Sequence, residues 1–146
     1  MKPAFSVIFL TTLIGAAQGL FLALFAADVM GPVGVASDFQ VLGSLLALVL
    51  SGLGLVASFF HLGHPERAWR SAAMWRTSWL SREVIALPLF MLGLLAYGTA
   101  HALDPDSTVA IGALVTLLCG ALFVCTGMVY ASIRFLQESP TRKDTI

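Results

Sequence analysis

The sequence predicts an all-α integral membrane protein in which four transmembrane helices form an up-down bundle, and two observations lead to this prediction. Charged residues make up only 11% of the 146-residue chain and hydrophobic residues 58%, whereas a soluble domain carries about 25% charged residues. The chain therefore has too few polar side chains to cover a surface that faces water. In addition, four stretches lack Asp, Glu, Lys and Arg and approach the roughly 20 residues that a helix needs to cross a bilayer.

We expect one membrane domain over residues 1–146, with helices at about 5–27, 41–60, 84–102 and 109–133. The first uncharged stretch is too long for an ordinary signal sequence, so we interpret it as a helix that is retained. Turn-forming Gly, Pro and Asp residues mark the connections after the first and third helices. The long connection, residues 61–83, separates the second and third helices.

Small residues within the predicted helices indicate close helix contacts, because lipid supplies no hydrophobic drive for association and small side chains let backbones approach. Gly15 and Gly19 form one small-xxx-small pair in the first helix. The second helix carries a run of such residues, namely Gly43, Ser44, Ser51, Gly52, Gly54 and Ser58. Gln18 is the amide within a span, and we expect it to form an interhelical hydrogen bond rather than to contact a ligand.

Basic residues predict the orientation of the bundle. All eight lie at the N-terminus, in residues 61–83 or at the C-terminus, and they are Lys2, Arg67, Arg70, Arg76, Arg82, Arg134, Arg142 and Lys143. Four crossings place these three regions on one side, and the other two connections carry only acidic charges. By the positive-inside rule, residues 61–83 and both termini are expected on the cytoplasmic side of a bacterial or archaeal inner membrane.

Residues 61–83 concentrate the chemistry of the chain, holding four of the six arginines, two of the three histidines and all three tryptophans. Each group has a plain structural interpretation. The tryptophans fit an interfacial aromatic belt, and the arginines fit a patch that binds lipid headgroups or a docking partner. The candidates for these contacts are Trp69, Arg70, Trp75, Arg76, Trp79 and Arg82. Ser81 is expected to cap the third helix, and Glu83 then supplies a favourable charge in its first turn.

A belt or a charged patch requires neither two histidines nor a glutamate at the same membrane face. Oxidation of a lipid-soluble quinol releases two protons and two electrons, so a site for it needs hydrogen-bond partners for the ring oxygens and a base that titrates near neutral pH. Histidine suits the base, and a partly buried glutamate suits a proton relay. His61, His64, Arg67 and Glu83 are therefore candidates for quinol binding and proton transfer.

We expect no haem, metal or iron–sulfur site in this chain. His101 lies at the far end of the third span from His61 and His64, so paired haem ligands at one depth are not available. Cys119 and Cys125 form no thiolate cluster. Any metal carriers of electrons would then belong to another polypeptide.

The segment His61-Leu-Gly-His-Pro-Glu-Arg-Ala-Trp-Arg70, followed by Trp75-Arg-Thr-Ser-Trp-Leu-Ser-Arg-Glu83, resembles the signature of the dimethyl sulfoxide reductase membrane-anchor subunit family (DmsC-type). The stretch Gly127-Met-Val-Tyr-Ala-Ser-Ile-Arg-Phe135 is similar to the end of that family's fourth helix. Family members usually have eight helices, so the resemblance covers their first four-helix half. His64 stands where the family often has another basic or polar residue.

The resemblance implies a subunit of a molybdoenzyme complex in anaerobic respiration. It implies menaquinol as the bound redox carrier, and a four-cluster iron–sulfur subunit and a molybdopterin catalytic subunit as partners. A second four-helix half is a further expected partner, the lipid bilayer is the surroundings, and no nucleic acid is expected. His61, Arg67 and Glu83 match family positions tied to quinol binding or electron transfer.

Two other functions remain open. The chain could be a passive membrane tether or assembly subunit without a quinol site, in which residues 61–83 only dock a partner. A small transporter fits less well, because transporters usually carry ionisable residues within their spans and these spans lack Asp, Glu, Lys and Arg. The chain itself is thus expected to be either non-catalytic or the quinol-oxidising subunit of an oxidoreductase.

Overall fold

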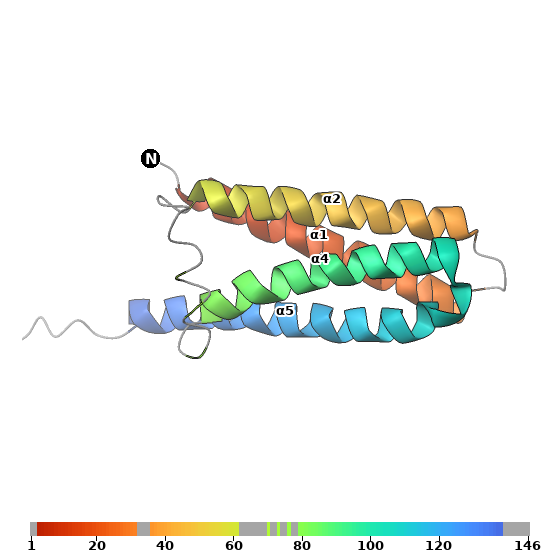
Figure 1. Ribbon diagram of the computed structural model, residues 1–146. Coiled ribbons are helices and arrows are strands. Elements are labelled where there is room, and N and C mark those ends of the chain that lie inside the picture. The colour runs from red at the N-terminus through yellow and green to blue at the C-terminus, as the bar shows by residue number, and fades with distance from the viewer. Residues whose placement is uncertain are drawn as a thin grey trace, which may run out of the picture.

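The computed structural model describes residues 3–31, 36–61, 70, 73, 76 and 79–138, with only the backbone of some residues near helix ends, including His61. In this part of the chain four helices are long and apolar enough to cross a membrane. They are α1 (Pro3–Met30), α2 (Ser37–His61), α4 (Trp79–Leu103) and α5 (Thr108–Glu138). The helices run alternately in opposite directions along the bundle (Figure 1). The prediction of an all-α membrane protein with four up-down transmembrane helices is confirmed.

Each helix packs most closely against its neighbour in the sequence. The contacts between α1 and α2, between α2 and α4 and between α4 and α5 are extensive, whereas α1 and α5 touch far less. A short 3-10 helix, η2 (Pro105–Ser107), turns the chain between α4 and α5. We call the end where α2 finishes and α4 begins the loop end, and the end that carries η2 the hairpin end.

Most helices extend beyond the uncharged stretches that marked them in the sequence. The clearest case is α4, which begins at Trp79, so Glu83 lies inside the helix. The prediction that Ser81 is the N-cap of this helix is wrong, because Ser81 is a buried residue within its first turn. The polar residues at the start of α4 belong to the bundle itself, and not to the connection before it.

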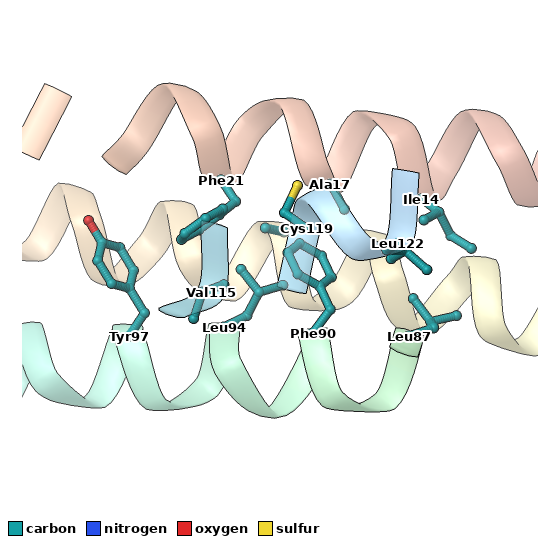
Figure 2. Close-up of a cluster of buried hydrophobic side chains, with 11 residues drawn as sticks. Ile14, Ala17, Phe21, Leu87, Phe90, Leu94, Tyr97, Val115, Cys119 and Leu122 are labelled. Carbon is teal, nitrogen blue, oxygen red and sulfur yellow. The ribbon is translucent and has the colours of Figure 1, made fainter. Parts of the chain in front are cut away.

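An aromatic and aliphatic core fills the centre of the bundle (Figure 2). Phe21 of α1 is fully buried, and its ring meets those of Phe90 and Tyr97 edge-on, with centroids 6.0 and 5.4 Å apart. Leu94 and Val115 bring α4 and α5 into the same layer. Edge-to-face aromatic contacts add to the stability gained from burial alone.

Two of the small residues of α2, Gly43 and Gly54, behave as predicted, but the glycine pair of α1 does not. A Cβ atom added at Gly54 would lie 2.8 Å from Ile14 Cγ1, and one at Gly43 would lie 2.6 Å from Leu24 Cδ2, so α1 approaches α2 closely at both positions. A Cβ atom added at Gly15 or Gly19 would meet nothing within 4 Å among the described residues. The predicted close contact at the Gly15–Gly19 pair is therefore absent from this bundle, because that face of α1 is turned away from α2.

Polar side chains inside the spans bind backbone carbonyls, as a lipid environment requires. Ser44 Oγ donates to Gln40 O at 2.7 Å, and Ser51 Oγ donates to Ala47 O at 2.8 Å, each within its own helix. Gln18 Nε2 donates to the carbonyl of Cys119 at 3.4 Å. This bond joins α1 to α5 and confirms the predicted interhelical role of Gln18.

Candidate functional site

Glu83 provides an ionisable group near the loop end of the bundle. It lies in the second turn of α4, and its side chain is half-buried between the helices. Thr126 Oγ1 of α5 donates a hydrogen bond to Glu83 Oε1 at 2.9 Å. The two residues are 43 positions apart in the sequence. The packing of α4 against α5 therefore fixes the direction in which the carboxylate points.

Two cavities meet at Glu83. The larger has a volume of about 80 Å³ and lies between α1, α4 and α5, and its polar lining residues are Thr11, Gln18, Glu83 and Thr126. The smaller has a volume of about 40 Å³ and lies between α1, α2 and α4, with Ser58 beside Glu83. Glu83 therefore lines a cavity on each side of α4. The larger cavity has room for a water molecule and several polar groups that could bind it.

Three more of the candidate residues surround the start of α4. The guanidinium carbon of Arg82 lies 4.3 Å from the centroid of the Trp79 ring, a cation–π contact. Arg82 Nη2 also donates to the carbonyl of Arg76 at 3.4 Å. Arg76 and Arg70 are exposed. These contacts fix Arg82 against the start of the helix.

Five of the sequence-predicted site residues cannot be placed with their side chains. His61 is the last residue of α2. It follows Ser58 by three positions, and Ser58 lines the smaller cavity together with Glu83. The side chain of His61 lies outside the described part of the structure. His64, Arg67, Trp69 and Trp75 lie entirely outside the described residues. The proximity of the histidines to Glu83 stays a prediction.

A second cluster of ionisable groups lies near the hairpin end. Tyr97 Oη donates to Asp28 Oδ2 at 3.0 Å, and His101 Nε2 lies 3.3 Å from the same oxygen. The contact with His101 lacks the geometry of a hydrogen bond, so it becomes strongly attractive only when the imidazole is protonated. Tyr97 is fully buried and its ring lies 4.7 Å from that of His101. The cluster connects α1 to α4 across the bundle.

The sequence patterns predict neither this cluster nor the partner of Glu83. They indicate Asp28 only as one of the acidic charges of the connection after the first helix, and His101 only as a histidine without a haem-ligand partner at the same depth. Thr126 gives no local signal, because a threonine hydroxyl within an apolar span usually binds a carbonyl of its own helix. Tyr97 gives none either, because its partner Asp28 lies 69 positions away in the sequence. Finding these pairs requires knowledge of which faces of α1, α4 and α5 meet.

The comparisons with known proteins identify relatives of the whole chain. The sequence model of the "DMSO reductase anchor subunit (DmsC)" family matches residues 1–143. A sulfite dehydrogenase subunit of Allochromatium vinosum is 55% identical over 155 aligned residues, which cover 94% of this chain and 48% of the relative. The chain thus spans about half the length of that relative. No solved structure matches the chain.

Proposed function

Because the chain belongs to the DMSO reductase anchor subunit (DmsC) family, we propose that it anchors a molybdopterin catalytic subunit and a four-cluster iron–sulfur subunit to the membrane of a bacterial or archaeal cell. Its four apolar helices suit the membrane role. The relative from Allochromatium vinosum is named as one subunit of a dehydrogenase, which supports a place in a multisubunit oxidoreductase. In this proposal the exposed arginines Arg70 and Arg76, with Trp69 and Trp75, contact the partner or lipid headgroups.

We further propose that the loop end of the bundle binds menaquinol and passes its electrons to the iron–sulfur subunit. The observation that carries this proposal is the half-buried Glu83 carboxylate, held by Thr126 beside an 80 Å³ cavity whose other lining residues carry no charge. A hydroxyl group of a quinol donates to such a carboxylate, which then accepts the proton as the two electrons leave. His61, His64 and Arg67 would complete the site, because imidazole accepts the second proton and guanidinium holds a ring oxygen.

The relative's name favours a second candidate, in which electrons flow in the opposite direction. A dehydrogenase removes electrons from its substrate, so in a sulfite dehydrogenase complex the anchor would deliver electrons to a quinone. The same residues serve both directions, since Glu83 then supplies a proton that the reduced ring takes up. Assays with menadiol as donor and with menadione as acceptor distinguish the two directions.

The decisive experiment compares Glu83→Gln and His61→Ala with Asp106→Asn in the full-length protein within its complex. Asp106 is an exposed acid in η2, so its amide variant controls for the loss of one carboxylate. Both site variants should lose most of their quinone-linked turnover, and dye-linked activity of the catalytic subunits should persist. Asp106→Asn should retain both activities.

The passive tether makes the opposite prediction for the same variants. If Glu83→Gln and His61→Ala retain quinone-linked turnover, or if the wild-type complex binds no quinone-site inhibitor, the tether is the correct function. Inhibitor binding that disappears on substitution of Glu83 supports the quinol site.

The orientation of the bundle is a separate proposal. The distribution of basic residues supports a cytoplasmic location of residues 61–83 and both termini. Cysteines introduced at Arg70 and at Asp106 in a background without native cysteines should then react with a membrane-impermeant reagent from opposite sides of the membrane. Labelling of Arg70→Cys from the outer face would reverse the orientation.

A further inference from the structure

The 80 Å³ cavity beside Glu83 reaches the outer surface of the bundle. Its inner wall carries Gln18, which is 3% exposed, and its rim carries Phe123 of α5, which is 48% exposed. Gly15 of α1 also lines it. The cavity therefore extends from a buried amide to side chains that face lipid. It follows the line along which α1 and α5 meet.

This line is the weakest of the four main helix–helix interfaces in the described part of the bundle. Helices α1 and α5 pack far less extensively than the three pairs of sequence neighbours. A Cβ atom built on Gly15 would find open space, and so would one on Gly19, one turn further along α1. The α1–α5 seam is thus a place where a flat molecule can pass between two helices without displacing a packed core.

We propose that the quinone or quinol reaches Glu83 sideways from the lipid, through the α1–α5 seam at Gly15, and that Gln18 binds the ring oxygen opposite the one that contacts Glu83. This inference rests on the proposed quinone-linked function. It adds the route from the membrane and a ligand-contacting residue on α1.

The chemistry of the cavity walls suits a ring with two oxygens. Glu83 Oε1 accepts from Thr126. Among the described residues no hydrogen bond reaches its second oxygen, to which a quinol hydroxyl would donate. The Gln18 amide donates to the Cys119 carbonyl at 3.4 Å, near the upper limit for a hydrogen bond. Exchanging this long bond for a bond to a ring oxygen therefore costs little.

The cavity at its present volume of 80 Å³ accommodates water, and a two-ring headgroup needs more room. Phe123 stands at the rim and is half-exposed, so its side chain can turn outward into the lipid. The isoprenoid tail then remains outside the bundle among the apolar side chains of α1 and α5. Lateral access consequently needs no opening of the cluster near the hairpin end.

The matched pair Gly15→Leu and Gly19→Leu tests the route. A Cβ atom added at either glycine meets none of the described residues within 4 Å, so the two positions tolerate substitution alike at the Cβ, but Gly15 lines the cavity and Gly19 does not. In the full-length complex, with menaquinol-4 as donor and menaquinone-4 as acceptor, Gly15→Leu should raise KM by about tenfold, equivalent to about 1.4 kcal/mol of binding. Gly19→Leu should leave KM near that of the wild type, and dye-linked activity should be unchanged in both.

Equal KM values for the two leucine variants would overturn the lateral route. A wild-type complex that exchanges no electrons with menadiol or menadione would instead end the proposed function, and this inference with it. The role of Gln18 is tested by Gln18→Leu, which should raise KM in parallel, and by Gln18→His, which keeps a donor and should recover much of the loss. A Gln18→Leu variant that loses thermal stability and keeps its KM would show that Gln18 only joins α1 to α5.

Discussion

Removing the hydroxyl of Tyr97 should weaken the whole bundle, because that group joins α1 to α4. In Tyr97→Phe the ring keeps its contacts with Phe21 and His101, at centroid distances of 5.4 and 4.7 Å. The change deletes only the 3.0 Å hydrogen bond to Asp28 and leaves its partly buried carboxylate with one partner fewer. Hydrogen bonds between membrane helices contribute about 0.6–2 kcal/mol, and bonds to charged groups about 1.5–3 kcal/mol.

We therefore expect Tyr97→Phe to lower the free energy of unfolding by about 1–2 kcal/mol, a factor of about 5–30 in the folded-to-unfolded ratio. Tyr130→Phe is the matched control, because Tyr130 is 48% exposed and its loss of a hydroxyl should change stability by less than about 0.5 kcal/mol. Unfolding of the purified protein in mixed detergent micelles measures both variants. Equal unfolding curves for Tyr97→Phe and Tyr130→Phe would refute the role of the hydrogen bond.

Two further outcomes follow from the contacts of α4 and α5. Thr126→Val removes the hydrogen-bond donor to Glu83 without a large change of volume, so it should lower quinone-linked turnover several-fold. Thr126→Ser keeps the hydroxyl group and should retain most of the turnover. Equal turnover of the two variants would show that Thr126 has no role in the site. Gly93→Ala should destabilise the bundle by about 1–3 kcal/mol, because the new methyl group would lie 2.7 Å from Val115 Cγ2. Gly120→Ala is the control, because its methyl group would meet none of the described residues within 4 Å. It should leave the melting temperature in a thermal-shift assay unchanged.

The sequence was sufficient to predict the four helices and their up-down order. Each of these features depends on local properties, since the length and apolarity of a stretch determine whether it crosses a bilayer. The start of α4 shows where local signals fail. Ser81 has the residue type of an N-cap, but helix formation continues back to Trp79, and the serine is buried against the bundle.

The glycines show why contacts could not be predicted from one helix at a time. Gly15 and Gly54 look alike in the sequence, yet Gly54 meets Ile14 and Gly15 faces open space. The difference depends on which side of α1 turns toward α2. The same limit applies to Thr126, whose hydroxyl finds Glu83 only because α4 and α5 are adjacent.

The order of helix contacts bears on how the bundle assembles. Its main interfaces join elements that follow one another in the chain, so each new helix finds its principal partner already inserted as synthesis proceeds from α1 to α5. Such a topology needs few long loop closures and favours rapid association in the membrane. Contacts of α1 with α5, including that of Gln18, can form only after α5 has been inserted. The α1–α5 seam would then be the last interface to form. It is also the least extensively packed of the main interfaces, which suits the passage of the proposed ligand.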